Sequence, residues 1–215
     1  MVTLSLNKGE KRELVYVNEP HLELHITQSE GSVLRLFVIN MGADDNAELS
    51  ADIQVDHVEE GCLTQVYALN YLQHEMRAQL KTNINHQVGG GKSEQLLKFV
   101  LLDEAKADFL GALHIAKDAQ KVDASQTNRN LLLSPKALIH TRPQLEIYAD
   151  DVKASHGAST GQLDEQALFY MQQRGIDRTT AERMLVAAFL REVLDALEDD
   201  TLKEQLINTM DGIVQ

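Results

Sequence analysis

His156 is the most accessible of the few residues that could do chemistry. It lies in the segment Ser155-His-Gly-Ala158, where small neighbours would leave its imidazole open to a metal ion or to another chain. Neutral imidazole is a good ligand for iron and a common site of proton transfer. From this local chemistry alone, His156 is predicted to be an ordinary histidine in a turn, and a functional role is the alternative.

Cys62 is the single cysteine of the chain. It follows Glu59 and Glu60 in a predicted turn, and nearby acids raise the pKa of a thiol, which disfavours a nucleophile. A lone cysteine excludes an internal disulfide and a four-thiolate zinc or iron–sulfur site built by this chain alone. It also fits a cytoplasmic protein.

Two motifs resemble known binding sites, but their context argues against both. Gly89-Gly-Gly-Lys-Ser93 has the end of a phosphate-binding loop, yet His86 stands where the first glycine belongs and a strand pattern follows at 96–101. His21 and His25 have the spacing of a zinc pair on a helix. Their segment alternates like a strand, which would separate them by roughly 13 Å. We predict a turn and two histidines on a polar strand face.

No other pattern supports catalysis. The chain has no Gly-x-Ser-x-Gly elbow, and no pair of carboxylates can be placed on one surface from the sequence.

The first 158 residues alternate between apolar and polar side chains in many short stretches, which predicts an almost entirely β region. The strands recur every ten to fifteen or so residues without helices between them, which favours a stacked solenoid over a sandwich. No repeat of fixed length is visible. The polar run Gln126–Asn130 would suit side-chain ladders inside a β-helix, and a solvated loop is the alternative.

The period changes near residue 160. A helix is predicted over 162–174, ending at Gly175, and a capping box at Thr179-Thr-Ala-Glu182 would open a second helix. A last amphipathic segment runs over 202–210, ending near Gly212. The apolar stripe of the second helix is interpreted as internal core, and a partner-binding groove is the alternative; it comprises Leu185, Phe189, Leu190, Val193, Leu194 and Leu197.

Composition limits the classes of partner. With 33 acidic and 20 basic residues, the formal charge is −13, which disfavours nucleic acid and anionic membranes as partners. No apolar run reaches the length of a membrane span, and the start lacks the pattern of a secretory signal.

Several spaced motifs resemble the SufB/SufD family of the SUF iron–sulfur cluster assembly machinery. The likeness is closest over about residues 84–190, and the Ser-His-Gly-Ala core is similar to the SufD side. The matching segments are Asn130-Leu-Leu-Leu133, Thr141-Arg-Pro-Gln-Leu-Glu-Ile147, Asp151-Val-Lys-Ala-Ser-His-Gly-Ala158, Leu168-Phe-Tyr170 and Arg174-Gly-Ile176.

The resemblance implies a right-handed parallel β-helix over residues 1–160, followed by a helical domain over 161–215. It implies a non-enzymatic scaffold that pairs with a SufB-like subunit through the last β-helix rungs and docks a SufC-like ABC ATPase through 163–213. His156 would face a cluster site shared with the partner, and a homodimer is the alternative in isolation. No cofactor would be held by this chain alone.

The chain also departs from the family pattern. Ala154 stands where many SufD members have a cysteine, and Ser134 follows Arg129-Asn130 where SufB members carry the interface cysteine. We therefore expect the sulfur ligands of a shared cluster to come from the partner. The chain begins later than typical SufD proteins, as expected of a short homologue or an excised piece, which would leave the first strand edge in need of cover.

Two other classes remain as alternatives. A carbohydrate-active β-helix enzyme, such as a lyase, would use aromatic platforms, yet the chain has no tryptophan. A transporter-associated component would be linked to the ABC ATPase, but the sequence predicts no membrane span.

Overall fold

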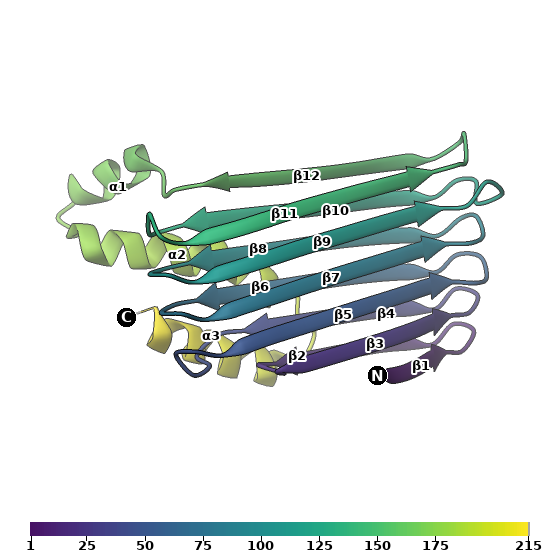
Figure 1. The fold of residues 1–215 in the computed structure, drawn as a ribbon, viewed down its shortest axis with the longest axis horizontal. Coiled ribbons are helices and arrows are strands. Elements are labelled where there is room, and N and C mark those ends of the chain that lie inside the picture. Colours follow the sequence, from purple (N-terminus) through teal and green to yellow (C-terminus); the bar gives the residue numbers. More distant parts are fainter. Residues whose placement is uncertain (215) are drawn as a thin grey trace.

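A computed structural model describes residues 1–214, which form a flattened coil of parallel strands followed by helices (Figure 1). The fold class expected from the sequence, a parallel β-solenoid with a helical C-terminal part, is confirmed. The strands are β1 (Val2–Leu6), β2 (Lys11–Val17), β3 (His21–Gln28), β4 (Val33–Asn40), β5 (Glu48–His57), β6 (Leu63–Leu72), β7 (Arg77–His86), β8 (Lys92–Leu101), β9 (Lys106–Ile115), β10 (Asp123–Leu132), β11 (Leu138–Ile147) and β12 (Lys153–Gly161). The helices are α1 (Glu165–Gln172), α2 (Arg178–Leu194) and α3 (Asp200–Ile213).

The strands alternate between two sheets. Sheet A has the order β1-β3-β5-β7-β9-β11, and sheet B has the order β12-β10-β8-β6-β4-β2, with parallel pairing throughout. Successive turns of sheet B are 29 to 31 residues apart from β4 onward, but β2 and β4 are only 22 apart, because Lys11 pairs with Val33. This variation in turn length explains why no fixed repeat is visible in the sequence.

The inner faces of the two sheets form the main core. Because successive side chains of a strand point to opposite faces, every second residue is buried between the sheets, as with Leu24, Ile53 and Leu80. Each fully buried aliphatic side chain contributes about 1.5–3 kcal/mol relative to exposure. The coil therefore has an apolar interior over most of its length.

Polar side chains inside the coil stack from one turn to the next. Asn40 donates through Nδ2 to Oδ1 of Asn70, its neighbour in register, at 2.7 Å. Asn128 and Asn130 are buried on β10 and bond to each other within the strand, and Asn130 also donates through Nδ2 to Oγ1 of Thr160 on the next turn at 3.2 Å. The run Gln126–Asn130 is thus part of a strand with interior ladders, and the loop alternative is wrong.

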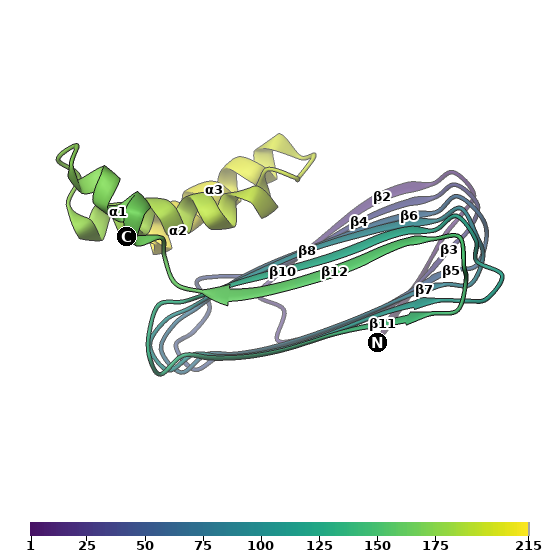
Figure 2. The ribbon, with the colours of Figure 1, turned by 90° about the horizontal axis from the view of Figure 1, so that it is seen from above.

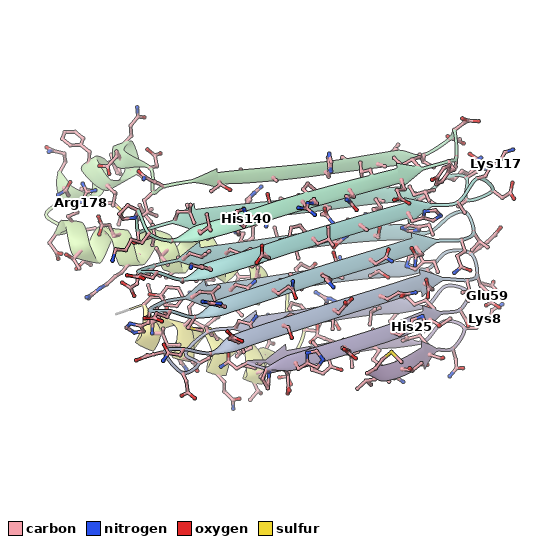
Figure 3. All side chains as sticks on the ribbon, viewed as in Figure 1. Lys8, His25, Glu59, Lys117, His140 and Arg178 are labelled. Carbon is pink, nitrogen blue, oxygen red and sulfur yellow. The ribbon has the colours of Figure 1, made fainter. Side chains whose placement is uncertain are left out.

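The helices cover only the outer face of sheet B (Figure 2). A second core lies between them and the sheet, where Phe37, Leu69 and Val100 meet Val186 and Leu190. The outer face of sheet A carries no helix, and His25 and His140 lie on it (Figure 3).

One buried cation helps attach the helices to the sheet. Lys98 of β8 is 1% exposed, and its Nζ bonds to the backbone oxygen of Phe189 and to the carboxylate of Glu192 on α2. Burial lowers the pKa of Lys98, whereas the bond from Lys98 lowers the pKa of Glu192. The interface is therefore polar as well as apolar.

The helix boundaries correct one expectation. α2 begins at Arg178, with Asp177 as the N-cap accepting from the backbone N–H of Thr180 at 3.0 Å. Glu182 instead pairs with Arg178, so the predicted capping box at Thr179–Glu182 is wrong. Aspartate is a stronger N-cap than threonine, which moves the start two residues earlier. The first helix, expected over 162–174, is shorter: α1 ends at Gln172, and Gly175 follows in the turn with a φ of +84°.

The apolar stripe of α2 packs against sheet B, which confirms that it is internal core. Val186, Leu190, Val193 and Leu194 are fully buried, whereas Leu185 and Phe189 are only half-buried. The buried face is thus rotated slightly from the predicted one, because the sheet lies on one side of the helix only.

Candidate functional site

The last turn of the coil has free strand edges. β11 ends sheet A and β12 ends sheet B, so within residues 1–214 each has a neighbouring strand on one side only. Almost every residue of β12 is exposed. Pro143 lies in β11, and proline is found in sheets mainly on edge strands because it has no N–H to donate. This end of the coil is open to a partner.

His156 lies at this open end. It belongs to β12, so the prediction of a turn histidine from local chemistry is wrong. It pairs in register with Gln126 of β10, whose side chain is buried inside the coil. The pairing places His156 in the same inward-facing column, and because no further turn covers it, the residue is exposed. An imidazole with interior orientation and an open outer side suits contact with a second chain.

The two positions that differ from the family pattern also lie near the end of the coil. Ala154 occupies the inward column of β12, two residues before His156, and is half-buried. Ser134 lies in the turn between β10 and β11, where it lines a cavity of about 460 Å³ together with Tyr71 and Arg178. Neither position supplies sulfur.

Among residues 1–214, no group of three or more His, Cys, Asp or Glu side chains is arranged to hold a metal ion.

The surroundings of Cys62 disfavour reaction at its thiol. Its thiol is buried and donates to the backbone oxygens of Glu59 at 3.1 Å and Ser29 at 3.2 Å. Burial is the main cause that raises its pKa; the charge of Glu59 adds a smaller part, and the backbone bond to Glu59 acts in the opposite direction. The raised pKa disfavours a nucleophile, as expected, but its main cause is desolvation rather than the neighbouring acids.

The sequence analysis missed a pair of interior histidines. His57 and His86 are neighbours in register at the ends of β5 and β7, both fully buried, with ring centroids 4.4 Å apart. Burial lowers the pKa of His57 to about 3 and that of His86 to about 4, so both are neutral at pH 7. The signal in the sequence that could have revealed the pair is that each histidine ends a predicted strand and that the two are one turn of the coil apart.

The hydroxyl groups opposite these rings hold them in place. His57 Nε2 lies 2.7 Å from Oγ1 of Thr64, and His86 Nε2 lies 2.9 Å from Oγ of Ser93. Thr64 donates its own proton to Gln28, so His57 Nε2 must carry the hydrogen of that contact. Neither Nδ1 has a hydrogen-bond partner among the described residues.

The His21/His25 pair and the glycine run lie in a strand and in a turn, as predicted. His21 and His25 lie on the outer face of strand β3, and His25 Nε2 contacts Oδ2 of Asp56 at 2.6 Å. Gly89–Gly91 form the turn before strand β8, and a Cβ on Gly89 would lie 2.4 Å from the backbone oxygen of Gln120. That glycine serves close packing between turns.

The helical part has an exposed apolar surface of its own. Phe169 and Tyr170 on α1 and Met184 on α2 are each about half exposed or more. Arg178, labelled in Figure 3, bonds to Glu165 of α1 and to Glu182 of α2 and so joins these helices. None of the helices within residues 1–214 combines the length and apolar character that crossing a bilayer requires.

Comparison with known proteins gives a consistent result. Residues 20–189 match the family model described as SUF system FeS cluster assembly, SufBD core domain. The iron–sulfur cluster assembly protein SufD of Escherichia coli is 43% identical over 127 residues, which cover 59% of this chain and 30% of that protein.

Two other relatives extend the match. An iron–sulfur cluster assembly SufBD family protein of Synechocystis is 35% identical over 181 residues, 84% of this chain and 39% of the relative. SufD of Bacillus subtilis is 36% identical over 142 residues, 66% of this chain and 32% of the relative. The chain thus spans roughly a third of the length of these relatives. With the family model covering most of its residues, the chain belongs to the SufBD family of SUF iron–sulfur cluster assembly proteins.

Proposed function

We propose that this chain is a non-enzymatic scaffold subunit that pairs with a SufB-like subunit through the last turn of its coil. The observation that carries this proposal is the pair of free edges on β11 and β12, with His156 exposed on β12. A partner presenting its own strand edges could continue both sheets, because parallel and antiparallel additions both satisfy unpaired backbone groups. The cluster under assembly is the cargo of the joined subunits.

His156 would meet this cargo as a nitrogen ligand or proton acceptor, and the partner would supply thiolates. The lack of sulfur at Ala154 and Ser134 and the buried state of Cys62 support this division of roles. The small neighbours Ser155 and Gly157 leave room for a second chain beside the ring.

The helical part would dock a SufC-like ABC ATPase through 163–213. The exposed Phe169, Tyr170 and Met184 support this proposal, because exposed large apolar side chains gathered on one part of a protein often mark protein contacts. Residues 1–160 and 161–215 would then act as a pairing part and a docking part.

Pairing is tested by mixing the purified chain with SufB-like and SufC-like subunits and measuring complex formation by size-exclusion chromatography. Ala158→Lys places a charge on exposed β12, and we expect it to abolish elution with the SufB-like subunit. The matched control is Ala112→Lys on the outer face of sheet A, which should leave the complex intact. Failure of the unaltered chain to join any complex would end the proposal.

The role of His156 is tested on the reconstituted complex. His156→Ala should form the complex normally but reduce the yield of assembled cluster at least several-fold, whereas His140→Ala on the open face of sheet A should not. An unchanged yield with His156→Ala would show that the ring serves no purpose in assembly.

A further inference from the structure

We propose that Gln126 is a positioning residue for His156: its side-chain carbonyl accepts the hydrogen on the inward nitrogen of the imidazole and leaves the outward nitrogen with its lone pair. This inference rests on the proposed function, in which His156 meets the cargo at the end of the coil.

The first observation is an unsatisfied buried amide. Gln126 is 1% exposed, and among residues 1–214 neither its Oε1 nor its Nε2 has a hydrogen-bond partner. Buried amides almost always have partners, and each exception calls for a physical reason. The amide of Gln126 lies one turn inside the open end of the coil, and both of its polar atoms are therefore available to hydrogen-bond to a neighbouring side chain.

The second observation is that Gln126 has no partner across the coil. In the preceding turn, Gln95 accepts a hydrogen bond from Oγ1 of Thr82 on the opposite sheet at 2.8 Å. Gly111 takes the place of Thr82 one turn later, and a Cβ there would lie 2.3 Å from Nε2 of Gln126. The amide nitrogen thus faces a residue without a side chain, and a rotation of the amide is what would bring its polar atoms to partners along the coil axis.

The third observation is that His156 is the next residue along that axis. Gln95, Gln126 and His156 are in register on β8, β10 and β12. Adjacent strands are about 4.8 Å apart, close enough for side chains in register to bond to each other. Asn130 on β10 does so with Thr160 on β12, through Nδ2 and Oγ1 at 3.2 Å.

Thr82 determines which atoms donate and which accept in the proposed series of hydrogen bonds. Its hydroxyl donates to Oε1 of Gln95, which keeps a second lone pair for Nε2 of Gln126. The structure closes neither bond of the Gln126 amide; in the proposed arrangement its NH₂ turns from Gly111 toward Gln95, and Oε1 then faces His156. A carbonyl behind the ring selects the tautomer with the hydrogen inward, the arrangement typical of histidines that ligate metals.

The test is the ratio of the two neutral tautomers of His156, measured by imidazole ¹⁵N chemical shifts in the full chain at mildly alkaline pH. We expect one tautomer to dominate in the unaltered chain and the ratio to change by about three- to tenfold in Gln126→Leu, as loss of one hydrogen bond predicts. Gln126→Met, which has a similar length, serves as a second variant should Gln126→Leu fail to fold.

Asn130→Leu is the matched control, because it removes a buried amide from the same strand but not from the column of His156. It should leave the His156 ratio unchanged. An unchanged ratio in a folded Gln126 variant, or an equal change in Asn130→Leu, overturns the inference.

Cluster yield on the reconstituted complex separates this inference from the proposed function. A changed tautomer ratio with no loss of yield in His156→Ala would refute the function and leave the role of Gln126 standing. A yield that depends on His156, with a ratio indifferent to Gln126, would refute the role of Gln126 alone.

Discussion

The middle turns and the last turn of the coil place the same residue type in opposite situations. His57 and His86 are covered by turns on both sides, and burial lowers their pKa values until both are neutral. His156 also occupies an inward-facing column, but no turn lies beyond it, and it is exposed. The comparison teaches that position along the coil decides whether an interior side chain is structural or available for chemistry. Changes in the middle should cost stability, and changes at the end should cost function.

The largest expected effect is the acid sensitivity of the interior pair. Both folded pKa values lie below the ordinary histidine value of 6.5, so the stability that these rings contribute is complete above about pH 6.5 and is lost as the pH falls toward about 4 and about 3. Between pH 7 and pH 5 the free energy of unfolding should fall by about 4 kcal/mol because of His57 and His86 together. The unfolded chain binds two protons there that the folded chain does not. Urea denaturation across this pH range measures it.

His86→Gln should roughly halve the fall in the free energy of unfolding between pH 7 and pH 5, since glutamine can still bond to Ser93 but does not titrate. His140→Gln, on the exposed face of sheet A, is the control and should leave the pH dependence of the free energy of unfolding unchanged. A pH profile that stays flat between 7 and 5 in the unaltered chain would contradict the neutral buried pair.

A smaller effect is expected at Gly91, which packs against the same two rings. A Cβ on Gly91 would lie 2.8 Å from Nδ1 of His57 and 2.9 Å from Nδ1 of His86. Gly91→Ala should therefore destabilise the chain by about 1–3 kcal/mol, the usual cost of overpacking. Gly157→Ala on β12 is matched in chemistry but meets no atom within 4 Å, and its thermal unfolding should barely change. Equal losses at both glycines would remove the distinction between middle and end.

The outer face of the middle turns offers a third test. Glu192→Gln leaves the buried ammonium of Lys98 without its carboxylate, and we expect a loss of about 1–2 kcal/mol, reduced because Glu192 itself is half exposed. Glu182→Gln, on the same helix but paired with exposed Arg178, should cost less than about 0.5 kcal/mol. Chemical denaturation of both variants decides whether burial of the cation makes the difference.

The smallest effect on stability is expected at His156. His156→Ala should change the unfolding free energy by less than about 0.5 kcal/mol, because the residue is exposed on the last strand. Thermal unfolding of the isolated chain checks this. A large loss of unfolding free energy in His156→Ala would mean that the ring supports the fold. Any loss of cluster yield in that variant would then follow from its lower stability.

Much of the architecture was predictable because apolar alternation reports the two faces of a strand directly. Leu22, Leu24 and Ile26 alternate with polar residues, and all three are buried inside the coil. The helix boundaries were less accurate. Thr179 and Asp177 both have side chains that can cap a helix, and in the structure Asp177, the stronger N-cap, takes that position.

The candidate site was only partly predictable. The Ser-His-Gly-Ala segment marked His156, but nothing local showed that it lies on a strand in register with Gln126. His57 and His86 escaped notice because each stands alone in its own stretch of sequence. Their contact depends on a step of one turn between strands, and turn lengths vary along the chain.

The amino-acid sequence by itself determined the alternation that makes strands, the change to helices after residue 160, the single thiol, and the segment that carries His156. Only the tertiary structure decided which interior polar groups meet and which remain uncovered. The physical reason is that solvation of a side chain depends on the turns stacked above and below it. Those neighbours lie about thirty residues away along the chain, beyond the reach of local sequence patterns.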